Sequence, residues 1–367
     1  MKKADQSMMY PLEEAVQNLE SVAVGTHSIV PDQANASLPE MLRFDREAEA
    51  NRIGNAVRNQ IRKQLRKRGA IVGLSGGIDS SVSAALCARA LGRDNVLAVL
   101  MPEKDSESDS LRLGRMMVDA ISIPYVIENI EPMLTAAGCY ARRDEFIRRV
   151  VPEFGPGWGC KVVITNALKG NGYNLTMLVV ESPDGQRQQL RMPLDVYLGV
   201  VAATNMKQRT RKHIEYFHAD RLNYAVIGTP NRLEYDQGFF VKNGDGAADI
   251  KPIAHLYKSQ VYALAEHLGV PEEIRRRPPT TDTWSLAQSQ EEFYFSLPYR
   301  EMDICLFGLN HGMTAEVVGK AAGLTAKQVE RVWRDIFSKR RATAYLHEPP
   351  LLVDSILSQI DRHRASG

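Results

Sequence analysis

A short segment rich in glycine and serine contains the residues with the clearest chemical purpose, Gly73-Leu74-Ser75-Gly76-Gly77-Ile78-Asp79-Ser80-Ser81. Glycines let the backbone approach an anion closely, serine hydroxyls donate hydrogen bonds, and a following helix presents free N–H groups. The segment lacks the Gly-Lys-Ser/Thr ending of a Walker A loop and is not GxGxxG, whereas Asp79 adds a carboxylate suited to Mg2+. We therefore predict a pyrophosphate cradle with a magnesium ligand.

The segments around this loop alternate between short apolar runs and longer helical patterns. Apolar residues recur every four positions over 48–68, which is typical of an amphipathic helix. Short strands that alternate with helices indicate βαβ units and a parallel sheet. We predict a doubly wound α/β fold with strands at 70–74, 95–101, 125–127 and 224–228, and with helices at 80–91, 108–121 and 195–220.

Residues 161–194 have a different pattern. Three β-prone runs are separated by two turn signals, Lys169-Gly170-Asn171-Gly172 and Pro183-Asp184-Gly185. This indicates a small antiparallel meander inserted into the α/β domain. The expected organisation is an N-terminal extension at 1–47 with one short helix at 12–24, a main domain at 48–345 with the insertion at about 140–194, a mostly helical part from 258 onward, and a C-terminal tail at 346–367.

Composition excludes several classes of protein. The 367 residues are 44% hydrophobic and 25% charged, which is typical of a globular protein, and the net charge of +2 favours neither nucleic acid nor an anionic membrane as a partner. No run approaches the roughly 18 apolar residues of a membrane span. The four cysteines form no CxxC pair and the N-terminus lacks an apolar signal core, so we expect a cytoplasmic protein without disulfides.

The glycine-rich segment resembles the SGGxDS loop of the ATP pyrophosphatase (PP-loop) superfamily, whose fold is the adenine nucleotide alpha hydrolase-like one. Members cleave ATP between the α and β phosphates to adenylate a carboxylate or carbonyl, and then add a nitrogen or sulfur nucleophile. The resemblance implies this reaction class and leaves the substrate open.

Further segments resemble the NAD synthase family in order and spacing over 57–341, outside the insertion. They are Thr204-Asn205-Met206-Lys207-Gln208-Arg209-Thr210-Arg211, Gly228-Thr229-Pro230-Asn231-Arg232-Leu233-Glu234, Gly238-Phe239-Phe240-Val241-Lys242-Asn243-Gly244-Asp245-Gly246-Ala247-Ala248-Asp249, Lys258, and Pro279-Thr280-Thr281-Asp282. The family makes NAD from deamido-NAD, ammonia and ATP, and its members are homodimers.

The resemblance implies a role for each matching residue. ATP would be bound by Gly73, Leu74, Ser75, Gly76, Gly77, Ile78, Asp79, Ser80, Arg209, Thr229, Lys258 and Thr280. Asp79 and Glu234 would hold Mg2+. The acid substrate would contact Lys242, Asp249 and Lys339.

The chemistry of adenylation supports these assignments independently. When a carboxylate attacks the α-phosphate, two anions repel one another, so the site needs a metal ion and cations on the departing pyrophosphate. The subsequent attack by ammonia requires a group that takes a proton, and Asp245 and Asp249 are the nearest candidates in the sequence. We accordingly expect Asp79, Lys258 and Asp245 to be the catalytic residues.

Departures from the family pattern concentrate on the acid-substrate side. The Q(T/S)DE-x-ELG stretch of the family is replaced within 284–296, where the Asp and the ELG are missing, and the C-terminal His-Lys pair is Ser338-Lys339. One alternative is therefore a relative that amidates a different carboxylate in a specialised pathway. Two others are an RNA-modifying enzyme, which the near-neutral charge and the missing CxxC pair disfavour, and a non-catalytic nucleotide-binding protein.

The nitrogen source has three possibilities. The 45-residue arm is too short for a nitrilase-type glutaminase domain, and no cysteine lies in a recognisable Cys-Glu-Lys arrangement. Nitrogen would therefore come from free ammonia, from a separate partner glutaminase, or from an amine substrate.

Overall fold

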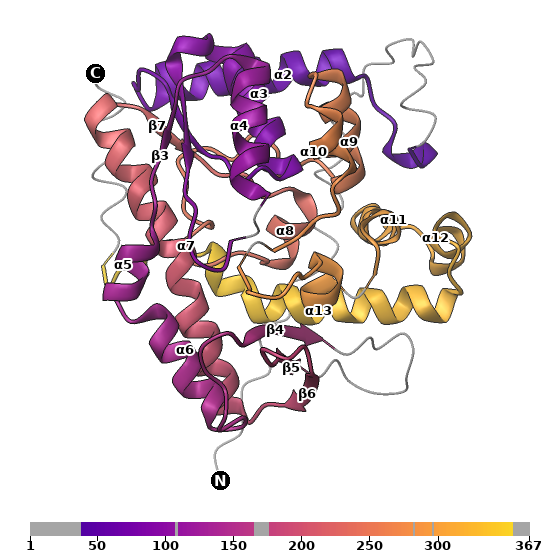
Figure 1. Ribbon diagram of the computed structural model, residues 1–367. Helices are drawn as coiled ribbons and strands as arrows, with labels where there is room; N and C mark the ends of the chain where they lie inside the picture. Colours follow the sequence, from indigo (N-terminus) through magenta and orange to yellow (C-terminus); the bar gives the residue numbers. More distant parts are fainter. Residues whose placement is uncertain (1–37, 107–108, 165–175, 282, 296, 355–367) are drawn as a thin grey trace. The chain divides into compact units, whose positions relative to one another are not determined.

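The computed structural model describes residues 38–106, 109–164, 176–281, 283–295 and 297–354 (Figure 1). The helix expected at 12–24 and the turn expected at 169–172 lie outside these residues, as does most of the N-terminal extension. All described residues belong to one unit, within 33–367.

Four parallel strands form the sheet predicted from the alternating pattern. Their order is β3-β2-β1-β7, and each lies within one or two residues of its predicted position. The bounds are β1 (Ala70–Gly73), β2 (Val96–Leu100), β3 (Tyr125–Ile127) and β7 (Ala225–Ile227). The main helices of this part are α2 (Arg46–Asn59), α3 (Ile78–Leu91), α4 (Ser110–Ile121) and α7 (Leu194–Leu222), with short helices η2 (Glu40–Leu42), η3 (Gln60–Gln64) and η4 (Arg93–Asn95).

The prediction of one helix over 48–68 was wrong at its C-terminal end. The helix begins at Arg46, continues into the π-helical turn η3 and ends at Gln64. Arg66 has a left-handed backbone conformation with a φ of 54°, which no helix can continue through. The chain thereby turns into β1.

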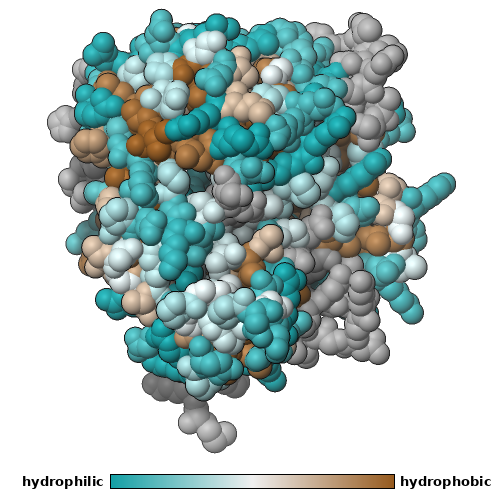
Figure 2. Space-filling model, in the orientation of Figure 1, coloured by the Kyte–Doolittle hydropathy of each residue, from teal (hydrophilic) through white to brown (hydrophobic). Residues whose placement is uncertain are grey.

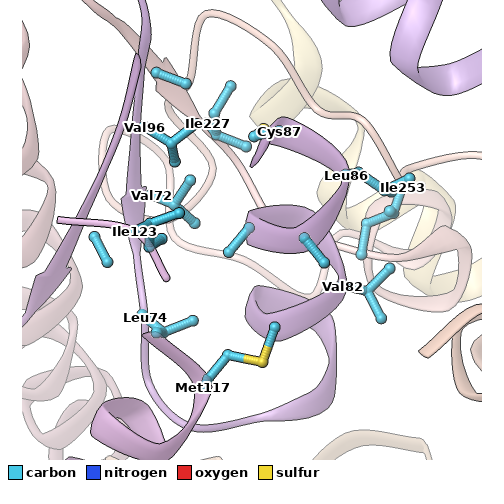
Figure 3. Close-up of a cluster of buried hydrophobic side chains, with 14 of the residues drawn as sticks. Val72, Leu74, Val82, Leu86, Cys87, Val96, Met117, Ile123, Ile227 and Ile253 are labelled. Carbon is cyan, nitrogen blue, oxygen red and sulfur yellow. The ribbon is translucent and has the colours of Figure 1, made fainter. Parts of the chain in front are cut away.

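The two faces of the parallel sheet are covered by different helices, as a doubly wound fold requires. Val72 and Ile71 are neighbours in β1 and point to opposite faces. Val72 packs in a cluster with Val82 and Leu86 of α3 (Figure 3). On the other face Ile71 packs with Ala219 of α7. Both faces are therefore buried, which explains the continuous apolar runs of the strands.

The order of the strands creates a switch point at β1. The connection from β1 leads to β2 on one side, whereas β7 pairs with β1 on the other side. Gly73 is level with Val99, and Val72 is level with Ile227, so the carboxyl ends of the strands lie at one edge. Ligands of open α/β sheets bind in the crevice at such a point.

The predicted antiparallel meander is confirmed as a separate sheet of order β4-β5-β6. The chain reaches it through α5 (Glu131–Ala136) and α6 (Cys139–Arg148), and its strands are β4 (Gly159–Ile164), β5 (Thr176–Glu181) and β6 (Arg187–Arg191). β4 begins before the predicted run because Cys160 already points into the core that the sheet shares with α6 and α7. The N-terminal half of α7 thus supports this sheet, while its C-terminal half covers the parallel one.

The predicted helical C-terminal part is also confirmed. From residue 258 onward it comprises α9 (Lys258–His267), α10 (Glu272–Arg276), η6 (Glu291–Phe295), α11 (Tyr299–Asn310), α12 (Ala315–Ala322) and α13 (Ala326–His347), and the short helix α8 (Arg232–Gln237) precedes it. The helices α11, α12 and α13 enclose their own core, in which Leu306, Val318 and Ile336 are buried. Leu233 of α8 belongs to the same core.

Surface and cysteines agree with the composition. Hydrophilic residues dominate the face shown in Figure 2, where hydrophobic residues form a larger patch at the upper left and smaller patches elsewhere. None of the helices in the described ranges is long and apolar enough to cross a bilayer. The cysteines Cys87, Cys139, Cys160 and Cys305 are all buried and free.

Candidate active site

A cavity of about 900 Å3 opens at the carboxyl ends of β1, β2 and β7. Its volume is at the upper end of the range for small-molecule sites, and its walls come from the loop after β1, from α7, from 229–245 and from α13. The predicted site residues that line it are Gly73, Leu74, Ser75, Gly77, Ile78, Asp79, Ser80, Arg209, Thr229, Glu234, Lys242, Asp245, Lys258, Thr280 and Lys339. Two others, Gly76 and Asp249, lie outside the wall.

The loop after β1 is organised by its serine hydroxyls. Ser80 and Ser81 donate hydrogen bonds to the carbonyl of Gly77, at 3.1 and 2.8 Å, and the hydroxyls of Ser75 and Ser80 are 3.3 Å apart. The N-cap residue of α3 is Gly77, which has no side chain that could accept a hydrogen bond from the first N–H groups. The first N–H groups of this 14-residue helix are thus available to an anion in the cavity.

Gly76 has a structural task although it does not line the cavity. Its φ is +75°, and a Cβ atom there would lie 2.8 Å from the carbonyl oxygen of Ser110 and 2.8 Å from the Cβ of Leu113 in α4. The loop therefore reaches its position only because Gly76 has no side chain.

Gly76→Ala is expected to lower the free energy of unfolding by about 2 to 4 kcal/mol, because it adds a strained φ to a backbone overlap. Denaturant unfolding measures the effect. Gly269→Ala is the matched control, since Gly269 has a φ of +71° and open space around its Cβ position. Equal losses in the two variants would contradict the proposed contact with α4.

Asp79 and Lys258 form the ionic centre of the site. The Nζ atom of Lys258 donates a hydrogen bond to Oδ2 of Asp79, and Nδ2 of Asn231 donates one to Oδ1 at 3.0 Å. Lys258 is only 1% exposed. Burial lowers the pKa of this lysine, but the charges of Asp79 and Glu234 outweigh burial and raise it above its ordinary value. The lysine is therefore a fixed cation at the cavity wall.

Glu234 is the second carboxylate of this centre. Its Oε2 accepts a hydrogen bond from the N–H of Asn231 in a capping box at the start of α8, and its Oε1 accepts one from Nε2 of Gln290 at 2.9 Å. Burial, together with the nearby charge of Asp79, raises the pKa of Glu234 to about 7. Among the described residues Glu234 forms no ion pair, and the charge of Lys258 only partly offsets these two effects.

These two carboxylates fit a magnesium ion that arrives with a polyphosphate. Mg2+ is commonly held by one or two protein carboxylates, with phosphate oxygens and water as the other ligands. Among the described residues, no group of three or more His, Cys, Asp or Glu side chains could hold a metal ion alone. The donor set therefore suits Mg2+ bound together with a nucleotide rather than a resident structural metal.

Asp303 holds Lys258 in place from a distant helix. This aspartate of α11 is fully buried, and its carboxylate accepts hydrogen bonds from the N–H of Lys258 at 3.1 Å and from the N–H and hydroxyl of Ser259 at 2.6 Å each. Burial raises its pKa to about 7 despite these bonds. The start of α9 is thus capped by a residue of another element.

Asp303→Ala is expected to lower the free energy of unfolding by about 3 kcal/mol or more, because three buried donors lose their acceptor. Asp45→Ala is the matched control: Asp45 caps α2 at the surface, and its loss costs about 1 kcal/mol. Thermal unfolding of both variants measures the difference. A loss in Asp303→Ala no larger than in Asp45→Ala would contradict the buried cap.

One face of α7 contributes polar side chains that the sequence reasoning missed. Thr204, Gln208, Lys212 and Glu215 line the cavity at intervals of three or four residues. Nζ of Lys212 donates a hydrogen bond to Glu215 at 2.6 Å. Because one face of a helix repeats every three to four residues, the predicted contact at Arg209 and the helical pattern together carried a signal for this face.

The loop at 238–249 separates its two aspartates. Oδ1 of Asp245 accepts a hydrogen bond from the N–H of Val241 at 2.7 Å, and burial raises the pKa of Asp245 at the cavity wall. Asp249 is exposed and its Oδ2 accepts the N–H of Val226 in β7 at 2.7 Å. The structure therefore brings Asp245 to the cavity and leaves Asp249 at the sheet.

The two other predicted substrate contacts are tied to neighbouring segments. Nζ of Lys242 donates hydrogen bonds to the carbonyls of Tyr345 at 2.6 Å and Glu348 at 3.0 Å, at the end of α13. Nζ of Lys339 donates to the carbonyl of Tyr294 and to Asp335, at 2.6 Å each. Both cations line the cavity, and both connect α13 to its wall.

Comparison with known proteins finds matches to one family over most of the chain. The sequence profile of the NAD synthase family matches residues 49–148 and 186–345. An NH(3)-dependent NAD(+) synthetase of Rhizobium meliloti is 64% identical over 90% of this chain and 98% of its own length. The protein of the same description from Thermotoga neapolitana is 35% identical over 78% of this chain and 90% of its own length.

Solved structures share the fold. An NMN synthetase from Francisella tularensis superposes with a TM-score of 0.58 at 21% identity, covering 85% of this chain and 100% of that chain. An NH3-dependent NAD synthetase from Campylobacter jejuni gives a TM-score of 0.56 at 21% identity, with the same coverage. The profile match extends over more than half of the sequence, and the chain belongs to the NAD synthase family.

Proposed function

We propose that the chain is an ammonia-dependent NAD synthetase, a ligase that converts deamido-NAD, ATP and ammonia into NAD, AMP and pyrophosphate. The pairing of Asp79 with Lys258 beside Glu234, at the exposed N-terminus of α3, is the observation that carries the proposal. Relatives with 64% identity over nearly their whole length bear this description.

The first step joins the acid to AMP. A carboxylate oxygen of the pyridine ring's carboxyl group attacks the α-phosphorus, the bond from that phosphorus to the bridging α,β-oxygen breaks, and pyrophosphate leaves. The N–H groups at the start of α3 and the hydroxyls of Ser75 and Ser80 bind phosphate oxygens. Asp79 and Glu234 would hold the Mg2+ that neutralises phosphate charge when ATP is bound.

Fixed cations stabilise the departing pyrophosphate. Lys258 is held by Asp79 and by the Asp303 cap, so its charge needs little reorganisation during the reaction. Arg209 lines the same cavity, and its Nε donates to the carbonyl of Lys242 at 3.3 Å. Thr229 and Thr280 supply hydroxyls beside the nucleotide.

The second step replaces AMP by nitrogen. Ammonia attacks the acyl carbon of the adenylate, the bond from that carbon to the AMP oxygen breaks, and a proton leaves the new nitrogen. Asp245 is the base in this proposal, because burial gives its carboxylate a raised pKa at the cavity wall. Lys242 and Lys339 provide cations for the phosphates of deamido-NAD. Asp249, which lies outside the cavity wall, would contact deamido-NAD only where the substrate extends beyond the cavity.

The proposal also covers the nitrogen source, the oligomeric state and the cellular location of the enzyme. Nitrogen comes from free ammonia, which a separate glutaminase could also supply. We further infer a homodimer, which is supported by Leu194 and Leu198 of α7, whose exposed fractions are 70% and 55%. We also infer a cytoplasmic location, which is supported by the free, buried thiols. A size-exclusion mass near 41.0 kDa would contradict the dimer.

The test uses purified protein with ATP and Mg2+. Deamido-NAD and ammonium should yield NAD and AMP in equal amounts, identified by mass, whereas glutamine in place of ammonium should yield far less NAD. Nicotinate mononucleotide in place of deamido-NAD tests a different acid of the same chemistry. ATP binding without NAD formation, together with amidation of the mononucleotide, would overturn the proposal.

A further inference from the structure

The inserted sheet has one strand edge that would be open without a neighbouring segment. β4 is an outer strand of the order β4-β5-β6, and residues 283–290, here called the strap, cover its free edge. The N–H of Leu286 donates to the carbonyl of Cys160 at 3.3 Å, and the N–H of Cys160 donates to the hydroxyl of Ser285 at 2.8 Å. Trp284 is 4% exposed and belongs to the core of the inserted sheet.

The other side of the strap holds the loop that contains Thr280. The N–H of Thr281 donates to the carbonyl of Gln288 at 3.3 Å, and the N–H of Gln290 donates to the carbonyl of Pro279 at 3.2 Å. An antiparallel bridge between Thr280 and Ser289 lies between these two bonds. The strap therefore lies between the inserted sheet and the loop that contains Thr280, and it forms hydrogen bonds with both.

Gln288 connects the two partners through a single side chain. It is 3% exposed, its Nε2 donates to the carbonyl of Val162 in β4, and its Oε1 accepts the hydroxyl of Thr281 at 3.1 Å. Both the nitrogen and the oxygen of this buried amide thus form hydrogen bonds. Such bonds are strong and directional because water does not compete with them.

The strap also reaches the ionic centre. Gln290, two residues after Gln288, donates to Glu234, and Thr283 accepts a hydrogen bond from the buried Lys207 at 2.8 Å through its carbonyl. The inserted sheet itself contributes Val162 and Ile164 to the cavity wall. The insertion is therefore part of the site's framework rather than a separate decoration.

We propose that Gln288 is a positioning residue that uses the inserted sheet to hold the Thr280 loop and Gln290 in the geometry that binds the phosphates of ATP. This rests on the proposed function in assigning ATP to the cavity. A shift of about 1 Å in a positioning group is enough to weaken a preorganised site strongly.

Gln288→Met tests the proposal, because methionine has a similar length and no amide. We expect the KM for ATP to rise about tenfold, with kcat and the KM for deamido-NAD within about twofold of the wild type. Gln189→Met is the matched control, since Gln189 is exposed on β6 of the same sheet. It should change none of these constants.

A double-mutant cycle separates positioning from general stability. Thr281→Val removes the same hydrogen bond from its other end, so Gln288→Met and Thr281→Val combined should raise the KM for ATP no more than Gln288→Met alone. Additive effects, an unchanged KM, or a fall in kcat alone would overturn the proposal. Should Gln288→Met fail to fold, Thr281→Val alone must still raise the KM for ATP.

The same variants are measured for direct ATP binding by calorimetry with Mg2+ and no acid substrate. A dissociation constant for ATP that is about tenfold higher in Gln288→Met than in the wild type supports the proposal, whether or not the wild type forms NAD. An unchanged constant, in protein whose wild type does form NAD, rejects the role of Gln288 and leaves the proposed function standing.

Discussion

Replacing Asp79 by asparagine is expected to reduce pyrophosphate release by about a thousandfold, which is the scale for losing one charged group that stabilises a transition state. The variant removes a carboxylate from the proposed Mg2+ site and leaves the buried cation of Lys258 without its anionic partner. An asparagine can still accept one hydrogen bond, from either Lys258 or Asn231, but it cannot balance the charge.

The measurement is continuous detection of pyrophosphate with saturating ATP, deamido-NAD and ammonium. Asp109→Asn is the matched control, because Asp109 forms an exposed ion pair with Arg112 and should retain full activity. Since removing one partner of a buried pair also lowers stability, rates are compared well below the melting temperature of Asp79→Asn. Activity within tenfold of the wild type would remove Asp79 from the catalytic centre.

Glu234→Gln is expected to change activity and stability in opposite directions. The activity should fall about a hundredfold, because a neutral amide is a poor Mg2+ ligand. The ligand-free protein should become more stable at pH 8, because burial and Asp79 disfavour the ionised form of Glu234 and raise its pKa to about 7. The side chain of Gln290 can rotate to present its oxygen to the new amide.

The sign of the pH dependence follows from that raised pKa. Between about pH 4.5 and pH 7 the carboxyl group is ionised in the unfolded chain before it is ionised in the folded one, so the wild type loses stability as the pH rises. Glu234→Gln lacks this loss. The difference in melting temperature between variant and wild type should therefore grow from pH 5 to pH 8, and a constant difference would contradict the raised pKa of the Glu234 carboxyl group.

The parts of the site that the sequence predicted are local in the chain. The loop at 73–81 combines glycines, hydroxyls and a carboxylate within one strand-to-helix connection, so its geometry follows from neighbouring residues. The strands before and after it were predicted within one or two residues for the same reason. Lys258 and Glu234, whose roles were assigned by resemblance, lie beside Asp79 of this loop in the folded chain.

The parts that could not be predicted depend on contacts between distant segments. Asp303 caps α9 from a helix whose own sequence gives no sign of that task, and Gln288 acts through a strand more than a hundred residues earlier. Asp245 and Asp249 lie in one short run, and only the path of the backbone decides which of them lines the cavity. Phe293 and Tyr294, the aromatic residues after the strap, also line the cavity, and their place there depends on where the strap lies.

The departures in 284–296 acquire a structural explanation. Where the family pattern has the Q(T/S)DE-x-ELG stretch, this chain has a segment that packs on the inserted sheet through Trp284 and Gln288. The change therefore accompanies the insertion, and it does not require a different carboxylate substrate. The two relatives of 64% identity, which align over 90% and 86% of this chain, carry the description of NH(3)-dependent NAD(+) synthetases.

Transfer of oxygen from the acid to AMP tests the central claim most directly. Deamido-NAD labelled with 18O in its ring carboxylate is turned over with ATP, Mg2+ and ammonium, and AMP and the phosphates are analysed by mass. Attack of the carboxylate on the α-phosphorus predicts one 18O atom in AMP and none in pyrophosphate. Unlabelled AMP, or label in inorganic phosphate, would contradict adenylation and with it the proposed use of the Asp79 and Lys258 site.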